Sequence, residues 1–123
     1  MKVIEIFKIL SDTNRLRILN ILYGKELCVC ELEYLLGISQ SNLSKHLRLM
    51  SQAGFLESRR QNKFAYYKIN ETVLKEHPFL ITILEKELIK ETDFLEEITK
   101  RQQYEVSELN CHNITAHTSK THQ

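Results

Sequence analysis

Apolar residues in the first half of the chain recur at the three- and four-residue spacing of amphipathic helices. The spacing predicts short helices over residues 3–10, 16–22, 28–36 and 39–53. Ser11-Asp12-Thr13 and Ser39 are helix-start signals. The chain has three glycines, and each follows one of these segments, where glycine lets a helix end. The sequence therefore opens with a run of short, well-separated helices.

The third and fourth predicted helices are joined only by Gly37 and Ile38 before the N-cap at Ser39. Ile38 can pack against Leu43 and fix the angle at which the chain enters the fourth helix. Two short helices joined by so tight a turn are typical of a helix-turn-helix.

Two strand-like runs follow, over residues 55–60 and 64–69, and the second is rich in aromatic and β-branched residues. The polar residues between them, Gln61-Asn62-Lys63, predict a hairpin turn. A basic-tipped hairpin directly after a helix-turn-helix is a wing. We therefore predict a mainly α fold with a small β-hairpin, a winged helix-turn-helix in the order α-α-α-α-β-β-α.

A last long helix is predicted over about 79–106, with Pro78 in its first turn. Its apolar stripe is broader than one small domain needs, so we interpret it as the surface of a homodimer, with packing onto the body as the alternative. The stripe consists of Leu80, Leu84, Leu88, Leu95 and Ile98. Residues 1–106 form the predicted DNA-binding and dimerisation domain. The polar residues 107–123, with Cys111, His112, His117 and His122, are expected to form a disordered tail.

Composition narrows the class of protein. The N-terminus does not resemble a signal peptide, and no apolar run approaches the roughly 20 residues that span a bilayer, so we expect a soluble, cytoplasmic protein without membrane contact. Three cysteines in a reducing cytosol are expected to be free thiols or metal ligands. The sequence lacks Cys-x-x-Cys and glycine-rich phosphate loops, which argues against an enzyme and against a small organic substrate.

The net charge of +1 hides a basic middle and an acidic C-terminal part. A local basic surface suits a polyanion, with a merely solvated surface or a protein-binding adaptor as alternatives. On the fourth helix, polar side chains turned away from the apolar face suit base edges and phosphates of double-stranded operator DNA. They are Gln40, Ser41, Asn42, Ser44, Lys45 and Arg48. On the wing, Arg59, Arg60 and Lys63 are expected to contact the DNA backbone or minor groove.

Three segments occur in order: SDTNRLRIL at 11–19, ELCVCEL at 26–32 and SQSNLSKHL at 39–47. Together they resemble the ArsR/SmtB family of metalloregulatory repressors. The resemblance implies a winged-helix homodimer that represses an operator over a resistance operon and releases it when an inducer binds. By the same resemblance, the DNA-reading positions fall on Gln40, Ser41, Ser44 and Lys45.

Cys28 and Cys30 are the chemical centre of the sequence. Two thiols two residues apart suit a soft ion such as arsenite, antimonite, Cd(II), Pb(II) or Zn(II), although small cysteines also pack well in cores. In a regular helix, such residues point about 200° apart. Our hypothesis is that capture of one ion by both thiols unwinds the first turn of the helix and shifts the dimer away from its DNA-binding state.

The sequence does not determine which residue is the third ligand of this site. In similar arsenite sensors, a third cysteine falls at the position of Glu33. Cys111 can replace it, from its own chain or from the partner's, and His112 and His117 are alternatives for a borderline metal. By the same resemblance, we do not expect the family's second site, on the last helix, because Leu95 stands at the position of its histidine. This favours As(III) or Sb(III), with Cd(II), Pb(II) or Zn(II) as alternatives. A thiol-redox or persulfide-sensing repressor, with Cys111 as disulfide partner, is the main alternative function.

Overall fold

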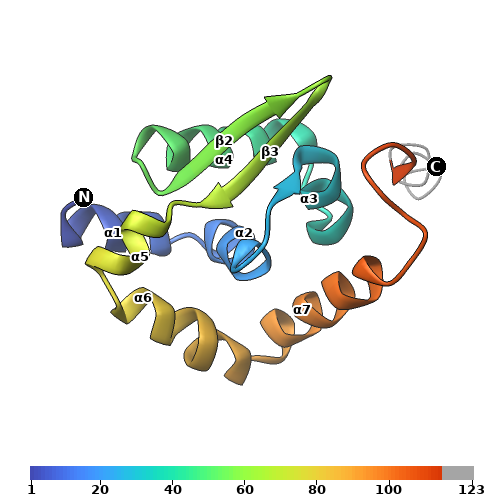
Figure 1. Cartoon of the computed structure of the whole chain (residues 1–123). Helices are drawn as coiled ribbons and strands as arrows, with labels where there is room; N and C mark the ends of the chain where they lie inside the picture. Colours follow the sequence, from blue (N-terminus) through green and yellow to red (C-terminus); the bar gives the residue numbers. More distant parts are fainter. Residues whose placement is uncertain (115–123) are drawn as a thin grey trace.

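The structure is a computed structural model of the chain and describes residues 1–114. Figure 1 shows the order of the elements. They are α1 (Val3–Leu10), α2 (Thr13–Leu22), β1 (Leu27–Cys28), α3 (Val29–Leu36), α4 (Gln40–Gln52), β2 (Leu56–Gln61), β3 (Phe64–Ile69), α5 (Glu71–Glu76), α6 (Phe79–Thr82), the π-helical turn η1 (Ile83–Glu87), the 3-10 turn η2 (Leu88–Lys90) and α7 (Thr92–Glu105). This is the predicted winged helix-turn-helix, with additional short elements.

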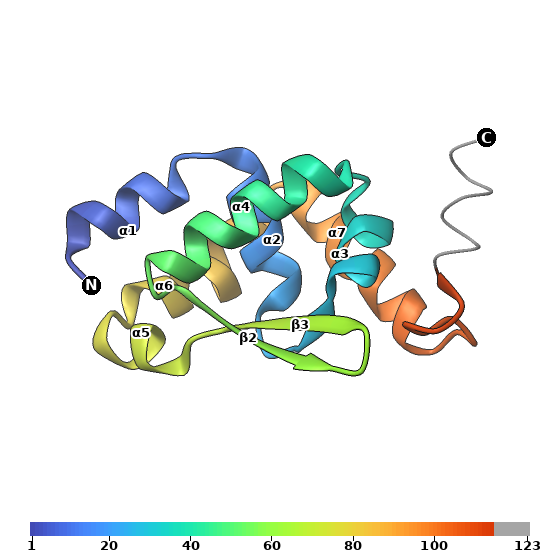
Figure 2. The same cartoon turned by 90° about the horizontal axis from the view of Figure 1, so that it is seen from above.

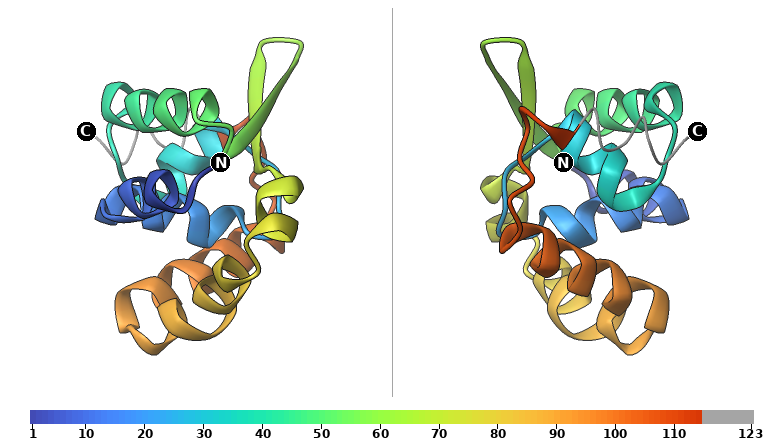
Figure 3. Two further views of the ribbon diagram at one scale, coloured as in Figure 1. Left: turned by 90° about the vertical axis from the view of Figure 1, so that its left-hand side faces the viewer. Right: turned by 90° about the vertical axis from the view of Figure 1, so that its right-hand side faces the viewer.

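Helix α2 lies in the middle of the molecule. It contacts α1, α3, β3 and α7, and α4 with the hairpin lies on the side opposite to α6 and α7 (Figures 1 and 3). Its residues Ile18, Leu19, Ile21 and Leu22 are all fully buried. A helix covered on several sides needs apolar residues around most of its surface, and the sequence of α2 supplies them.

The helix-turn-helix consists of α3 and α4, as predicted. Gly37 ends α3 in the left-handed region at φ 65°, and its N–H donates to the carbonyl of Glu33 at 2.9 Å. Ile38 is buried, and the Ser39 hydroxyl accepts from the Asn42 N–H at 3.4 Å. The short connection therefore fixes the direction in which α4 leaves α3.

The wing is the hairpin of β2 and β3, and it turns at Asn62 and Lys63, with Asn62 at φ 56°. On its other side, β3 pairs with a third strand that the sequence did not predict. Strand β1 pairs with β3 through Leu27↔Tyr67 and Cys28↔Tyr66, which gives the order β1-β3-β2. Two residues are too short for an alternating pattern, so only the folded chain reveals this strand.

The prediction of one long helix over 79–106 is wrong. The helix is interrupted at Glu91, whose backbone is extended at φ −98° and ψ 128°. The bend lets both halves of the predicted helix pack onto the body. The side-chain amide of Asn20 donates a hydrogen bond to the Phe94 carbonyl at 2.9 Å. Helix α5 was also not predicted; Asn70 caps it by accepting from the Thr72 N–H.

The bend changes the interpretation of the apolar stripe. Leu80, Leu84 and Leu88 are at most 5% exposed within one chain, so these residues pack onto the body instead of forming a dimer surface. Leu95 remains 48% exposed. Among the residues described, no helix combines the length and the apolar character needed to cross a membrane.

Of the tail expected to be disordered over 107–123, the structure describes residues 107–114. After α7 this segment turns back towards α3 and the wing (Figure 1), and Ile114 is fully buried. Local bonds shape the turn, including one from the Asn110 N–H to the Asn113 side chain at 2.8 Å. The polar sequence of this segment has no periodicity, so it gave no signal that Ile114 is buried. His117 and His122 lie outside the described residues.

The turn between α3 and α4 offers a test of the fold. No atom lies within 4 Å of a Cβ placed on Gly37, so replacing it with alanine adds only backbone strain. We expect Gly37→Ala to lower the free energy of unfolding by about 1 kcal/mol in urea titrations, and Gly37→Asn to cost less because asparagine tolerates the left-handed region. Equal stability of the wild type and Gly37→Ala would contradict this account of the turn.

Candidate functional site

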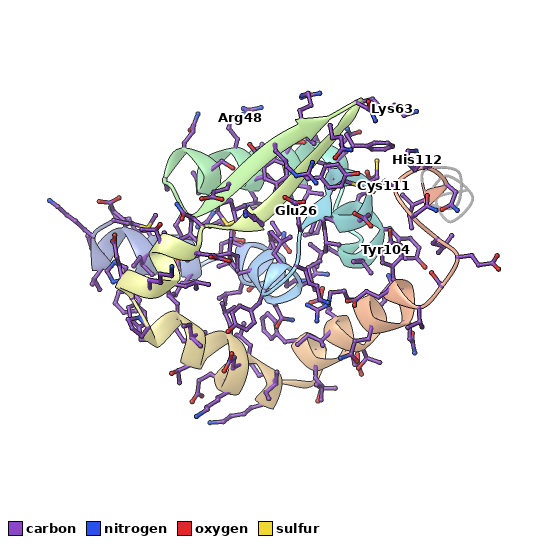
Figure 4. All side chains as sticks on the ribbon, in the orientation of Figure 1. Glu26, Arg48, Lys63, Tyr104, Cys111 and His112 are labelled. Carbon is purple, nitrogen blue, oxygen red and sulfur yellow. The ribbon has the colours of Figure 1, made fainter. Side chains whose placement is uncertain are left out.

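One face of α4 carries polar side chains and is open to solvent. Gln40, Ser41, Lys45 and Arg48 are exposed, and Asn42 and Ser44 are partly buried. The opposite face holds Leu43, Leu47 and Met50, which are at most 1% exposed. Figure 2 shows α4 crossing the face turned towards the viewer, with the hairpin beside it, and Figure 4 shows Arg48 pointing away from the body. The structure therefore places the six predicted DNA-facing residues of α4 on a single helix, and four of them are exposed.

The wing projects from the same side of the molecule as α4, opposite to α6 and α7 (Figure 3). Lys63 lies at its tip (Figure 4), and Arg60 is also exposed. These two cations are free to reach a polyanion that lies along α4.

Arg59 is placed differently from the other wing cations. Its guanidinium contacts both carboxylate oxygens of Glu26, at 2.7–3.1 Å, and lies 4.6 Å from the centre of the Tyr66 ring. The sequence analysis missed Glu26, because nothing in the local pattern indicates a partner 33 residues away. Arg59 thus joins the middle of β2 to the segment before β1, and a DNA contact would compete with this ion pair.

Cys28 lies just before α3, not in its first turn. Its backbone is extended (φ −84°, ψ 165°), and the helix begins at Val29. The Cys28 sulfur accepts from the Glu31 N–H, and the Glu31 carboxylate accepts from the Cys28 N–H at 2.9 Å, a reciprocal capping box. The hypothesis that two helical thiols point apart therefore starts from a wrong premise, because only Cys30 belongs to the helix.

Cys111 reaches Cys28 within the same chain. The sulfurs of Cys28 and Cys111 and a carboxylate oxygen of Glu31 all lie within 4.8 Å of one another. We call these three residues the thiol–carboxylate cluster. Cys30 is partly buried and is not a member of the cluster. The structure thus brings together two of the three predicted ligands and adds Glu31, which the sequence analysis missed although it stands at the capping-box spacing from Cys28.

Two tyrosines surround the cluster. The Tyr66 hydroxyl donates to the Cys111 sulfur at 3.4 Å, and the Tyr104 hydroxyl of α7 donates to the second oxygen of Glu31 in a short hydrogen bond. The hydrogen bond to Cys111 raises the pKa of Tyr66 to about 12, and burial raises the pKa of the Cys28 thiol. Figure 4 shows Tyr104 on α7 and Cys111 on the C-terminal segment, close to the wing. The cluster and its two tyrosines therefore form a largely buried polar contact between the start of α3, the wing, α7 and the C-terminal segment.

Helix α7 holds α3 at both ends. At the C-terminal end of α3, Arg17 of α2 donates to the Leu36 carbonyl at 2.6 Å and to both oxygens of Glu97 on α7 at 3.0 and 3.1 Å. Lys100 of α7 donates to the Tyr34 carbonyl at 3.0 Å. At the other end of α3, Tyr104 bonds to Glu31. The cluster is therefore in direct contact with α7, and α3 connects it to α4.

Comparison with known proteins gives a consistent picture. Residues 12–58 match the family described as "Bacterial regulatory protein, arsR family". The chain is 42% identical over 69 residues to the arsenic resistance transcriptional regulator ArsR1 of Pseudomonas putida, a match that covers 55% of this chain and 54% of that protein. It is 34% identical over 72 residues to the transcriptional repressor SdpR of Bacillus subtilis, covering 58% of this chain and 80% of SdpR. Both relatives are regulators and not enzymes, in agreement with the prediction.

A solved structure supports the fold. The homodimeric winged helix-turn-helix DNA-binding domain of Mb0332 from Mycobacterium bovis superposes with a TM-score of 0.59 at 25% identity. The superposition covers 73% of this chain and 84% of that one. The match to ArsR1 spans only about half of the length of that protein.

The buried bond between Tyr104 and Glu31 gives a prediction on stability. Tyr104→Phe leaves a buried carboxylate oxygen without its donor, so we expect the free energy of unfolding to fall by about 1–3 kcal/mol. The matched control is Tyr23→Phe, which removes an exposed bond to Glu85 and is expected to change stability by less than about 0.5 kcal/mol. Urea titrations of both variants give the comparison, and equal losses would show that burial of the bond does not matter.

Proposed function

Because the chain belongs to the arsR family of bacterial regulatory proteins, we propose that it is a repressor that binds operator DNA as a homodimer and releases it when its thiols capture a soft ion. The observation that carries this proposal is the proximity of Cys28 and Cys111 beside the helix-turn-helix. Two sulfurs from distant parts of the chain, held together behind the wing, suit a thiol-binding ion such as As(III), Sb(III), Cd(II), Pb(II) or Zn(II).

The DNA-binding part of the proposal rests on α4 and the wing. In a helix-turn-helix, the second helix lies in the major groove with its N-terminal residues at the base edges. In α4 these are Gln40 and Ser41, with Ser44, Lys45 and Arg48 further along the exposed face. Arg60 and Lys63 suit backbone contacts, which set affinity and salt dependence.

The dimer part of the proposal rests on exposed apolar side chains. In α1, Val3, Ile4 and Phe7 are 47%, 60% and 52% exposed, and the Phe7 ring lies 6.0 Å from that of Phe79. Leu95 on α7 is also exposed. Such a row of large apolar groups on a short helix is suited to a second copy of the chain. We therefore place the dimer surface mainly on α1, in addition to the last helix that the sequence indicated.

Release of DNA would follow from the position of the thiols. Cys28 and Glu31 cap α3, which packs against α4, and Cys28 also pairs with Tyr66 of the wing. A protein that binds an ion with these groups has to rearrange the cap of α3. Both proposed DNA-facing elements, α4 and the wing, pack against this part of the chain. The ion then shifts the equilibrium by the difference between its affinities for the two states.

The same proximity favours a second candidate, a thiol-redox repressor. An oxidant such as a peroxide or a polysulfide would take two electrons and two protons from the thiols of Cys28 and Cys111 and leave a disulfide between them. The two sulfurs lie within 4.8 Å of each other, and neither is in a disulfide in the structure. Release of DNA by Cd(II) or arsenite while a reductant is present would separate ion sensing from this candidate.

DNA binding can be tested by removing one cation from α4. We expect Lys45→Ala to weaken operator binding about tenfold or more, and to reduce the dependence of affinity on salt if Lys45 contacts a phosphate. The control is Lys86→Ala, an equal loss of charge on the exposed surface of η1, at the other end of the molecule. Fluorescence anisotropy with an operator duplex measures both. Similar losses in the two variants would mean that only net charge matters.

The ion response can be tested at Cys111. We expect Cys111→Ser to raise at least tenfold the Cd(II) or arsenite concentration needed to release a bound duplex, because one of two sulfurs is lost. His112→Ala is the control: the sequence allowed this exposed histidine as an alternative ligand, but it lies outside the cluster, so we expect the variant to respond as the wild type does. If Cys111→Ser responds like the wild type, the C-terminal thiol has no part in sensing.

A further inference from the structure

We propose that Glu31 is the third ligand of the ion site, which makes the thiol–carboxylate cluster a two-sulfur, one-oxygen site for a divalent cation of the zinc group, Zn(II) or Cd(II). This inference rests on the proposed function, and it names the donor set and the class of ion. It replaces Cys30 in the predicted ligand set with a carboxylate.

The distances support this donor set. Ligand sulfurs lie about 2.3 Å from Zn(II) and carboxylate oxygens about 2.0–2.2 Å, so two ligand atoms of one tetrahedral ion lie roughly 3.6–3.8 Å apart. The three ligand atoms of the cluster already lie within 4.8 Å of one another. Small side-chain movements therefore suffice to bring them around one ion.

The environment also supports it. Glu31 is only 8% exposed, and buried carboxylates are rare unless they are paired or bound to a cation. Its oxygens accept from the Cys28 N–H and the Tyr104 hydroxyl, and a carboxylate has about four lone-pair sites, so it keeps acceptor capacity for an ion. Among the residues described, no other group of three histidine, cysteine or acidic side chains converges in this way.

The donor set selects the class of ion. Zn(II) accepts mixed thiolate and carboxylate ligands in tetrahedral sites, and it often keeps a water in the fourth position. Trigonal As(III) is best satisfied by three thiolates, and Cys30 is outside the cluster.

Tyr104 has the place of a positioning residue. It donates to Glu31 from α7 and does not belong to the ligand group. Partners that orient a metal ligand typically change affinity by roughly 10–100-fold when they are removed. Tyr104→Phe is therefore expected to weaken Cd(II) binding within that range while the number of sulfurs bound to the ion stays the same.

The experiment measures Cd(II) binding by competition with a chelator, together with X-ray absorption of the Cd(II)-loaded protein to count sulfur ligands. The variants are Glu31→Gln, which can still accept at the capping box, and Cys30→Ser. We expect about two sulfurs and at least one oxygen on the ion in the wild type, the same in Cys30→Ser, and at least tenfold weaker binding in Glu31→Gln. Thermal unfolding of each variant without ion verifies that it is folded.

The outcomes separate the two proposals. Three sulfurs in the wild type, a sulfur lost in Cys30→Ser, or unchanged affinity in Glu31→Gln would overturn the role of Glu31. The proposed function survives that result if Cys28→Ser and Cys111→Ser each fail to bind Cd(II). If both serine variants bind Cd(II) and arsenite as tightly as the wild type, thiol sensing itself is overturned.

Discussion

The capping box formed by Cys28 and Glu31 is the interaction on which the other features of this molecule depend. It closes the first turn of α3 from both sides, with the sulfur accepting one N–H and the carboxylate another. Cysteine is an unusual N-cap, because serine, threonine, aspartate and asparagine are preferred at that position. Its presence here gives the sulfur a structural role in addition to the ligand role that we propose for it.

The cap also gathers parts of the chain that are distant in sequence. Cys28 pairs with Tyr66 of the wing, Glu31 accepts from Tyr104 of α7, and Cys111 lies next to both from the C-terminal segment. Because α3 packs against α4, the cluster is one element away from the helix that we propose binds DNA. A coupling between ion and DNA then needs no long path through the core.

The helix-turn-helix and the hairpin could be predicted from the sequence because their signals are local: Gly37, the Ser39 cap, and Asn62 between two strand-like runs. The site could be predicted only in part. Cys28 is visible as a thiol, but its exclusion from the helix depends on pairing with Tyr66 of β3, and the approach of Cys111 depends on the bend at Glu91 and the burial of Ile114. These are contacts between distant residues, which no local pattern records.

The most direct test of this account is to crosslink the thiols with a short bifunctional reagent and identify the joined peptides by mass spectrometry, in dimers that mix isotope-labelled and unlabelled chains. The account predicts a product that joins Cys28 to Cys111 within one chain, since these two sulfurs are neighbours in the folded monomer. A product that joins Cys28 mainly to Cys30, or Cys28 to the Cys111 of the other chain, would contradict it.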